Sequence, residues 1–296
     1  MMRRGKMSTL RLIALMLCLA TVLMGCSANR FIYNRADTFV RWVVDDYVDL
    51  NRDQQAAFDT QLQQFLDWHR RDELPQYRQF IVSSRDALGD GVTLQEAVAI
   101  SESIEAAADR MQIRLVDLLL LSAEGLSARQ IQDFLTEVDR QQEDYATKRL
   151  TRDEQAYYQD SSDSLVSLAK RLMGRLSKEQ KALIKVEAAQ LTRLDYLWHR
   201  DRAVWGAKLR AILERKATDW QSQVRFLGDT RSQARTPEYI EGIERNGDII
   251  LALLVDLINT RTERQDKHLQ RFLAGLINDI DALTVANLAQ SLVVEQ

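Results

Sequence analysis

The stretch TLQEAVAISESIEAAADRMQIRLVDLLLL (residues 93–121) shows most directly which fold class the chain adopts. Thr93 is followed three residues later by Glu96, the capping-box pattern that begins a helix. Apolar residues then recur at spacings dominated by three and four, which lays them along one helical face. They are Leu94, Val98, Ile104, Ala108, Met111, Leu115 and Leu118. The stretch therefore predicts a long amphipathic helix that ends near Leu121 and buries one face against its neighbours.

The rest of the chain is read in the same way, because it is poor in residues that break helices. Only 2 Pro and 11 Gly occur in 296 residues, well below the usual usage of about 5% and 7%. A sheet-rich domain needs many tight turns, and turn residues are what this sequence lacks. Helices joined by short turns pack as antiparallel neighbours, so the fold predicted is all-α, an elongated antiparallel helical bundle.

Caps and breakers set the predicted boundaries. Helices are expected over Phe31–Tyr47, Asn51 to about Arg71, Pro75–Leu88, Ala128–Tyr145 and Thr151–Met173. Ser177 is expected to open a very long helix through Leu197 and Ile212, and Thr236 to cap one that runs from Pro237 towards Phe272, before a last helix over Ile277–Val293. No Ser/Gly/Pro-rich linker divides the chain, so residues 31–296 are predicted to form a single helical domain.

The N-terminus has the three parts of an export signal. Basic residues precede an apolar run, Leu12 to Met24, which ends in Gly25 and Cys26. The run is shorter than the roughly 20 apolar residues that a transmembrane helix needs. Leu23-Met24-Gly25-Cys26 resembles the lipobox of bacterial lipoproteins. This resemblance implies a signal peptide over residues 1–25, cleavage between Gly25 and Cys26, acylation of Cys26, and a short tether over residues 26–30.

Lipidation implies a tethered protein, because each buried CH₂ of an acyl chain contributes about 0.8 kcal/mol to membrane binding. By resemblance to Gram-negative lipoproteins, Ser27 after the cysteine is an outer-membrane sorting residue, which predicts the periplasmic face of the outer membrane. Cys18 lies in the signal, so no other thiol is left for a disulfide, a metal site or catalysis. Without the signal's basic residues, 36 Lys and Arg face 43 Asp and Glu, a formal balance of −7 that disfavours nucleic acid as a partner.

One local pattern occurs at three positions: Leu50 to Gln54, Leu126 to Gln130, and Leu176 to Gln180. Each has Leu, a capping residue, two further residues and Gln, which joins a hydrophobic staple to a capping box. The pattern therefore predicts three helix starts. It also resembles the Leu-Thr-x-x-Gln motif of small periplasmic helical chaperones related to Spy and CpxP, which implies a similar compartment and not a shared activity.

Two Trp-His-Arg segments are the candidate functional residues outside the signal. They are Trp68-His69-Arg70 and Trp198-His199-Arg200, and Trp42 is a further candidate for partner binding. Histidine is a common metal ligand and proton carrier, yet neither segment has the His-x-x-x-His or Glu-x-x-His spacing of a metal site. The interpretation favoured is a tryptophan at the bundle rim with polar neighbours in water. The alternative is a cation-binding or enzymatic site that also uses Asp45, Asp46 and Asp49.

The segment FIYNRADTFVRWVVDDYVDLNRDQQAAFDTQLQQFLDWHRRDELPQY (residues 31–77), together with the lipobox, resembles a family of uncharacterised proteobacterial lipoproteins known as a domain of unknown function. The family implies no catalytic residues. No phosphate loop, nucleophile elbow or dinucleotide fingerprint is present, so no enzyme, cofactor or metal is expected. Aromatic and arginine residues on helical faces are typical of interfaces, which favours a scaffold or chaperone-like factor that binds another envelope protein. The sequence leaves the oligomeric state open.

Overall fold

The computed structural model describes residues 28–89, 91–215, 217–231 and 233–294, and the side chains of residues 30–284 within these ranges. Every regular element in them is a helix, which confirms the all-α prediction. The proposed signal and the residues Gly25, Cys26 and Ser27 lie outside the described residues. Among the described helices, none combines the length and apolarity that crossing a bilayer requires.

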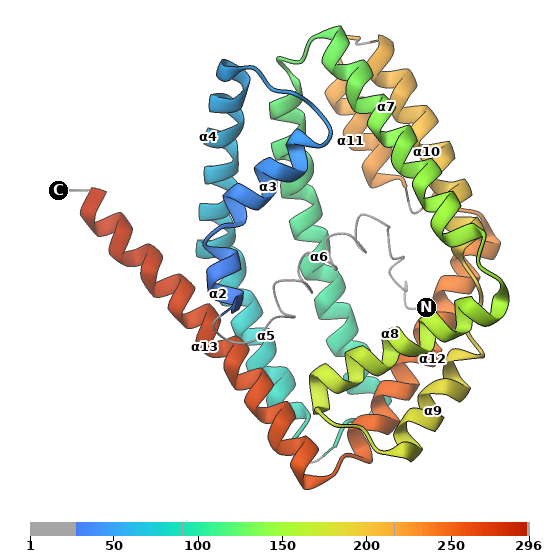
Figure 1. Ribbon diagram of the computed structural model, residues 1–296. Helices are drawn as coiled ribbons and strands as arrows, with labels where there is room; N and C mark the ends of the chain where they lie inside the picture. The colour runs from blue at the N-terminus through green and yellow to red at the C-terminus, as the bar shows by residue number, and fades with distance from the viewer. Residues whose placement is uncertain (1–27, 90, 216, 232, 295–296) are drawn as a thin grey trace.

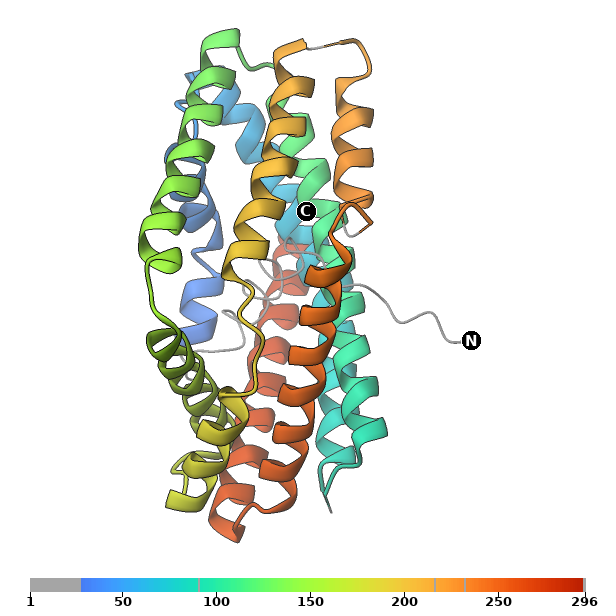
Figure 2. The ribbon, with the colours of Figure 1, turned by 90° about the vertical axis from the view of Figure 1, so that its right-hand side faces the viewer.

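The chain runs back and forth along the long axis of an elongated body (Figures 1 and 2). Two short helices come first, α2 (Ala28–Tyr33) and α3 (Ala36–Asp45). A first leg then consists of α4 (Arg52–Trp68), the π-helical turn η1 (His69–Glu73) and α5 (Leu74–Ala87), and α6 (Leu94–Ala123) returns beside it.

The next part of the chain repeats this course. A second leg consists of α7 (Ala128–Tyr145), the π-helical turn η2 (Ala146–Leu150) and α8 (Glu154–Met173), and α9 (Lys178–Ala188) and α10 (Asp195–Arg215) return beside it. Each leg starts at a capping box, and each has a widened turn after a helix of 17 or 18 residues. The chain closes with α11 (Trp220–Asp229), α12 (Pro237–Asn259) and α13 (Glu263–Val294).

Capping boxes begin four of these helices as predicted, at Asn51, Thr93, Ser127 and Ser177. Thr262 begins α13 with the same reciprocal bonds to Gln265. Sequence reasoning missed this box because Arg261 precedes it, where the other three motifs ending in Gln have Leu. Each box satisfies backbone N–H groups that a helix start leaves without an intrahelical partner.

The glutamines of these boxes also pair with one another across the bundle. Gln54 and Gln130 exchange side-chain amide hydrogen bonds of 3.1 and 2.7 Å, which joins the starts of α4 and α7. Gln180 and Gln265 do the same at 3.2 and 2.8 Å, which joins α9 to α13. Each of these glutamines thus caps its own helix and also joins that helix to a second one.

Three predicted helices are broken where long-range contacts intervene. The helix expected from Phe31 to Tyr47 is interrupted after Tyr33, whose hydroxyl lies 2.7 Å from Nδ1 of buried His69. The long helix expected from Ser177 ends at Ala188, because the side chain of Asn246 bonds both the N–H and the C=O of Thr192 at 2.8 Å.

The helix from Pro237 likewise stops at Asn259 and does not reach Phe272. The side chain of Asn259 accepts a bond from the N–H of Val92 and donates one to its C=O, at 2.7 and 2.8 Å. α13 then begins at Glu263, so the helix expected to begin at Ile277 is part of a longer one. The expected break after Arg71 is instead the widened turn η1, and Pro75 stands in the first turn of α5 as predicted.

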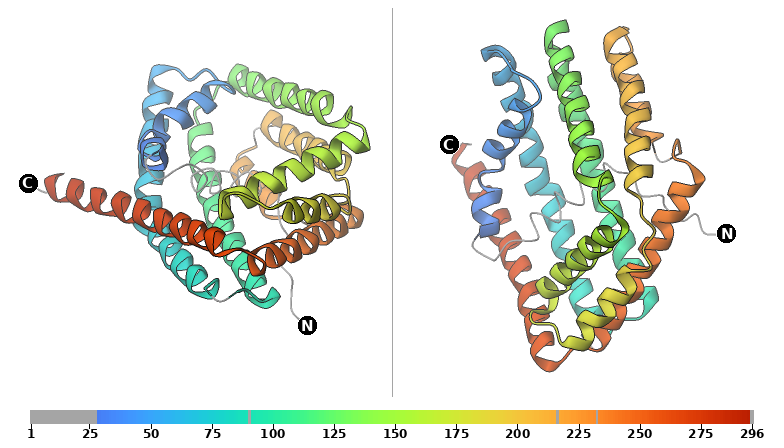
Figure 3. Two further views of the ribbon diagram at one scale, coloured as in Figure 1. Left: turned by 60° about the horizontal axis from the view of Figure 1, so that its bottom comes forward. Right: turned by 45° about the vertical axis from the view of Figure 1, so that its right-hand side comes forward.

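Most of the buried apolar side chains gather at one end of the body. The larger clusters join α5 and α13, and α8, α9 and α12, where these helices converge (Figure 3). The end built by α4 and α6 has smaller clusters around Phe58, Leu62 and Met111. The packing is therefore densest where the chain turns between α12 and α13.

Candidate functional site

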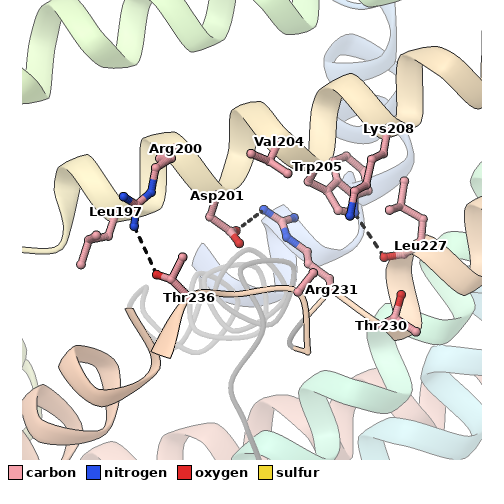
Figure 4. Close-up of a pocket in the computed structure, with 11 residues that line it drawn as sticks. Leu197, Arg200, Asp201, Val204, Trp205, Lys208, Leu227, Thr230, Arg231 and Thr236 are labelled. Atoms are coloured by element: carbon pink, nitrogen blue, oxygen red, sulfur yellow. Dashed lines mark hydrogen bonds and ion pairs between the residues drawn. The ribbon is translucent and has the colours of Figure 1, made fainter. Parts of the chain in front are cut away.

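A pocket of about 430 Å³ lies between α10, α11 and the segment that leads into α12 (Figure 4). Its apolar lining includes Leu197, Val204, Trp205 and Leu227. The volume falls within the range of small-ligand pockets, about 300–1,000 Å³. The pocket is thus large enough to accept one or two side chains of a partner, or a small molecule.

Cationic side chains surround this apolar lining. Arg200, Lys208 and Arg231 line the pocket, against Asp201 as the one acidic side chain among the described lining residues. Arg231 donates to Asp201 at 3.4 Å and stacks over the ring of Trp205 at 4.9 Å. The lining residues therefore have a positive balance on a chain whose formal net charge is −3, although Arg200 also pairs with Glu238 beside the pocket at 3.6 Å.

Arg231 is buried, with 5% of its surface exposed. Burial lowers the pKa of its guanidinium, and the charge of Asp201 acts in the opposite direction. Its Nε has no hydrogen-bond partner among the described residues. Since buried polar groups are nearly always bonded, an acceptor that enters the pocket would complete the bonding of this guanidinium.

The second Trp-His-Arg segment contributes one residue to the pocket. Arg200 lies at its edge and donates to the hydroxyl of Thr236 at 3.2 Å. This contact replaces the side-chain cap expected of Thr236, which caps α12 through its backbone position alone. Trp198 and His199 pack instead against Tyr145 of α7, with ring centroids 4.0 and 6.2 Å apart. The predicted packed tryptophan with polar neighbours in water thus describes Trp198 and the exposed Arg200, whereas His199 is half-buried against Tyr145.

The first Trp-His-Arg segment is arranged differently, and its placement at the rim in water was wrong for the histidine. His69 is 6% exposed, on the widened turn η1, because Tyr33, Phe65 and Tyr77 enclose its ring. Burial first, and then the charge of Arg70, lower the pKa of His69 to about 4. The ring is therefore neutral at pH 7, and its Nδ1 shares a hydrogen bond of 2.7 Å with the hydroxyl of Tyr33, whose direction follows from the tautomer.

A second buried polar side chain, Glu73, lies one helical turn after His69. Glu73 is 1% exposed and accepts two hydrogen bonds from Arg110 of α6, at 2.8 and 3.0 Å. A bidentate pair of this kind fixes both side chains. His69 and Glu73 thus have structural partners, and the two Trp-His-Arg segments lie in separate aromatic clusters.

The three aspartates of the alternative site are all exposed. Asp45 is the last residue of α3, and Asp46 and Asp49 follow it. In the described part of the chain, no group of three or more His, Cys, Asp or Glu side chains is placed to hold a metal ion. Arg41, one turn before Asp45, pairs with Asp59 of α4 at 2.8 Å. Trp42 of α3, the remaining candidate, is 61% exposed.

Sequence reasoning missed the pocket as a whole and identified one of its residues, Arg200. The other lining residues come from α10, α11 and the segment over residues 230–236, whose contacts no local pattern specifies. One signal was available: the polar, broken segment between Gly228 and Thr236 contains Arg231 and Arg235, both buried in the structure.

The chain was compared with known families, curated proteins and solved structures. A family model described as a family of unknown function (DUF6279) matches residues 46–240, roughly two thirds of the chain. No curated protein and no solved structure matches it. The matched range includes both widened turns and the pocket, and it excludes α2 and α13. By this match the chain belongs to the family of unknown function DUF6279.

Proposed function

We propose that this chain is a lipid-anchored protein of the cell envelope, whose helical body binds a segment of another protein in the pocket between α10 and α11. The pocket is the observation that carries the binding role, because it joins an apolar lining to cationic side chains. Aromatic and arginine side chains of this kind provide most of the energy of many interfaces. The anchor rests on the sequence around Cys26, and the outer-membrane address on Ser27.

The chemistry of the pocket specifies the partner segment. An aliphatic or aromatic side chain fits beside Val204 and Trp205, and a carboxylate fits beside Lys208 and the guanidinium of Arg231. We therefore expect a segment with an apolar residue close to an acidic one or to a C-terminal carboxylate. A scaffold or chaperone-like factor needs such a site and needs no catalytic group.

The competing function, a cation-binding or enzymatic site at the Trp-His-Arg segments, has less support. His69 is enclosed by aromatic rings, and His199 packs on Tyr145 in a different part of the body. Reactive chemistry needs several groups that converge on one point. The acidic cluster after α3 adds no further ligand to either histidine.

The anchor is tested by labelling cells with an alkyne analogue of palmitate. The native protein is expected to carry the label, a Cys26→Ala variant to lose it, and a Cys18→Ala variant to keep it. Cys18 is the matched control because it is the other cysteine of the chain. Equal labelling of the Cys26→Ala variant and the native protein would show that the anchor is wrong.

The binding site is tested with a photo-crosslinking residue at position 204 in intact cells, compared with position 186. Val204 and Val186 are 51% and 59% exposed, and only Val204 lines the pocket. A discrete crosslinked partner is expected from position 204 alone, and Lys208→Glu should reduce its yield about tenfold, which corresponds to about 1.4 kcal/mol of binding. The same partner at both positions, or a yield unaffected by Lys208→Glu, would count against the pocket.

A further inference from the structure

α3 has apolar side chains that pack on the body and others that are exposed. Its inner face, with Ala36, Val40 and Val44, packs over α4 on the cluster around Phe58 and Leu62 (Figure 3). These inner side chains are partly buried, and α3 itself contributes no fully buried one among the described residues. The exposed apolar side chains of α3 lie outside this cluster.

α2, which directly precedes α3 in the chain, also has exposed apolar side chains. Phe39, Trp42 and Val43 are 53%, 61% and 36% exposed, and Phe31 and Ile32 of α2 are 65% and 37% exposed. Single exposed apolar residues are ordinary, but a contiguous group of large ones marks an interaction surface. We call these residues, Phe31, Ile32, Phe39, Trp42 and Val43, the outer face.

The covalent chain determines what lies next to this outer face. An extended chain spans at most about 3.6 Å per residue, so Ala28 lies within about 7 Å of Cys26. The helical rise of 1.5 Å per residue adds only about 5 Å to Phe31. If Cys26 carries the lipid, the outer face begins within about 12 Å of the membrane surface.

We infer that the outer face lies in the headgroup region of the membrane that holds the Cys26 lipid, as an interfacial helix pair beside the anchor. The inference rests on the lipid anchor proposed above. Amphipathic helices in this position bury their apolar face about 5–10 Å into the headgroup boundary. Tryptophan is enriched at that depth, because its ring is both apolar and polar.

The charges of the two helices suit phosphate headgroups. Over residues 28–45, the span of α2 and α3, Arg30, Arg35 and Arg41 stand against Asp37 and the terminal Asp45. Cations near a membrane surface gain free energy from anionic lipids. Arg30 and Arg41 also pair with Asp279 and Asp59, so headgroup phosphates would share these two cations with carboxylates of the body. The exposed acidic cluster, Asp45, Asp46 and Asp49, begins only where α3 ends. This order, basic and aromatic first and acidic after, places the exit from the headgroup region at the end of α3.

α2 is also held firmly to the body. Arg30 forms an ion pair of 3.2 Å with the buried carboxylate of Asp279 on α13, and Tyr33 bonds to His69. A membrane contact through α2 and α3 would therefore fix the orientation of the whole bundle, and not only its distance from the membrane.

The test uses the purified lipidated protein in vesicles of phosphatidylethanolamine and phosphatidylglycerol with brominated acyl chains, which quench nearby tryptophans. The native protein and a Trp198→Phe variant should both be quenched, whereas Trp42→Phe should lose most of the quenching. Trp198 is the matched control, because it stacks on Tyr145 away from the outer face. Both variants keep an aromatic ring, so the fold is preserved.

Three other outcomes are distinct from one another. Equal quenching of Trp42→Phe and native protein, or no quenching of either, would contradict the inference. If Cys26 still carries the palmitate label in that case, the lipid anchor itself is not contradicted. A photo-crosslinker at position 42 that captures a protein and no lipid in cells would overturn it as well. Loss of the palmitate label at Cys26 in the native protein would overturn the anchor, and the membrane assignment with it.

Discussion

At the residue scale, the widened turn η1 has two buried polar side chains, one buried as a neutral group and the other as a charged one. His69 is buried as a neutral ring against Tyr33, whereas Glu73 is buried in a bidentate ion pair with Arg110. Widened turns of this type shift the helix face by one residue and often occur at special sites. Here the shift turns both side chains inward, which makes the turn the polar centre of the first leg.

The ion pair leads to the first prediction. Arg110→Ala leaves the carboxylate of Glu73 buried without its guanidinium, and breaking a buried pair in this way costs about 3–5 kcal/mol. Because the side chain of Arg110 is 38% exposed, we expect the lower end, a loss of about 3 kcal/mol in the free energy of unfolding. Arg71→Ala is the control, since Arg71 pairs with Asp72 at the surface and exposed pairs contribute below about 1 kcal/mol. Urea unfolding measures both, and equal losses would contradict the assignment.

The histidine leads to the second prediction. The folded pKa of His69, about 4, lies below the ordinary value of 6.5, so the unfolded chain binds the proton first as the pH falls. The stabilisation from the neutral ring is complete above pH 6.5 and is lost between about pH 6.5 and 4. Its size is about 3 kcal/mol at most, from 1.36 kcal/mol per pKa unit. His69→Gln should therefore flatten the stability profile in this window, and an unchanged slope would show that the ring is not buried neutral.

At the element scale, the bundle is held by glutamine and asparagine side chains that bond to distant backbone. The pair Gln180 and Gln265 is buried, at 7% and 4% exposure, and Gln265 also donates to the carbonyl of Arg175 at 3.0 Å. Gln265→Ala removes these bonds and leaves the side chain of Gln180 and the carbonyl of Arg175 without them, which lowers the free energy of unfolding by about 2 kcal/mol. Gln54→Ala, in the less buried pair, should cost about half as much by the same principle. Thermal or urea unfolding that ranks the two variants in the opposite order would refute this role.

The same elements show what the sequence could predict. Capping boxes at Thr93 and Ser127 are local patterns, and the structure confirms both. The breaks at Thr192 and Asn259 were missed, because each depends on an asparagine bond to backbone 54 or 167 residues away. The helix preference of the intervening residues favours continuity, and tertiary contacts overrule it.

The candidate site was less predictable for a related reason. A pocket needs the relative placement of several helices, and the ion pair of Asp201 with Arg231 spans 30 residues. His69 was placed at the rim because its neighbours in sequence are polar, whereas its burial comes from Tyr33, 36 residues earlier. Spacing along the chain gave no signal for either contact.

At the scale of the whole molecule, the apolar packing is uneven, and this leads to the last prediction. The clusters that join α5, α8, α9, α12 and α13 contain most of the buried apolar side chains. By contrast, among the described residues of α10 and α11 the buried apolar side chains are Leu209, Trp220 and Leu227. Local stability follows the buried apolar contacts of a region.

Native-state hydrogen exchange should therefore show the amides of α10 and α11 opening well before those of α12 and the first half of α13. If a partner segment fills the pocket between α10 and α11, its binding should slow exchange there by the ratio of free ligand to Kd, about a hundredfold at 100 times Kd. Amides of α12 and α13 that open only with the whole bundle should slow by the same factor, because global unfolding also destroys the pocket, whereas amides that open by local fluctuations away from the pocket should not respond. Uniform exchange across the chain would show that the two ends are equally stable, and would remove the reason to expect that the pocket end adapts to a partner.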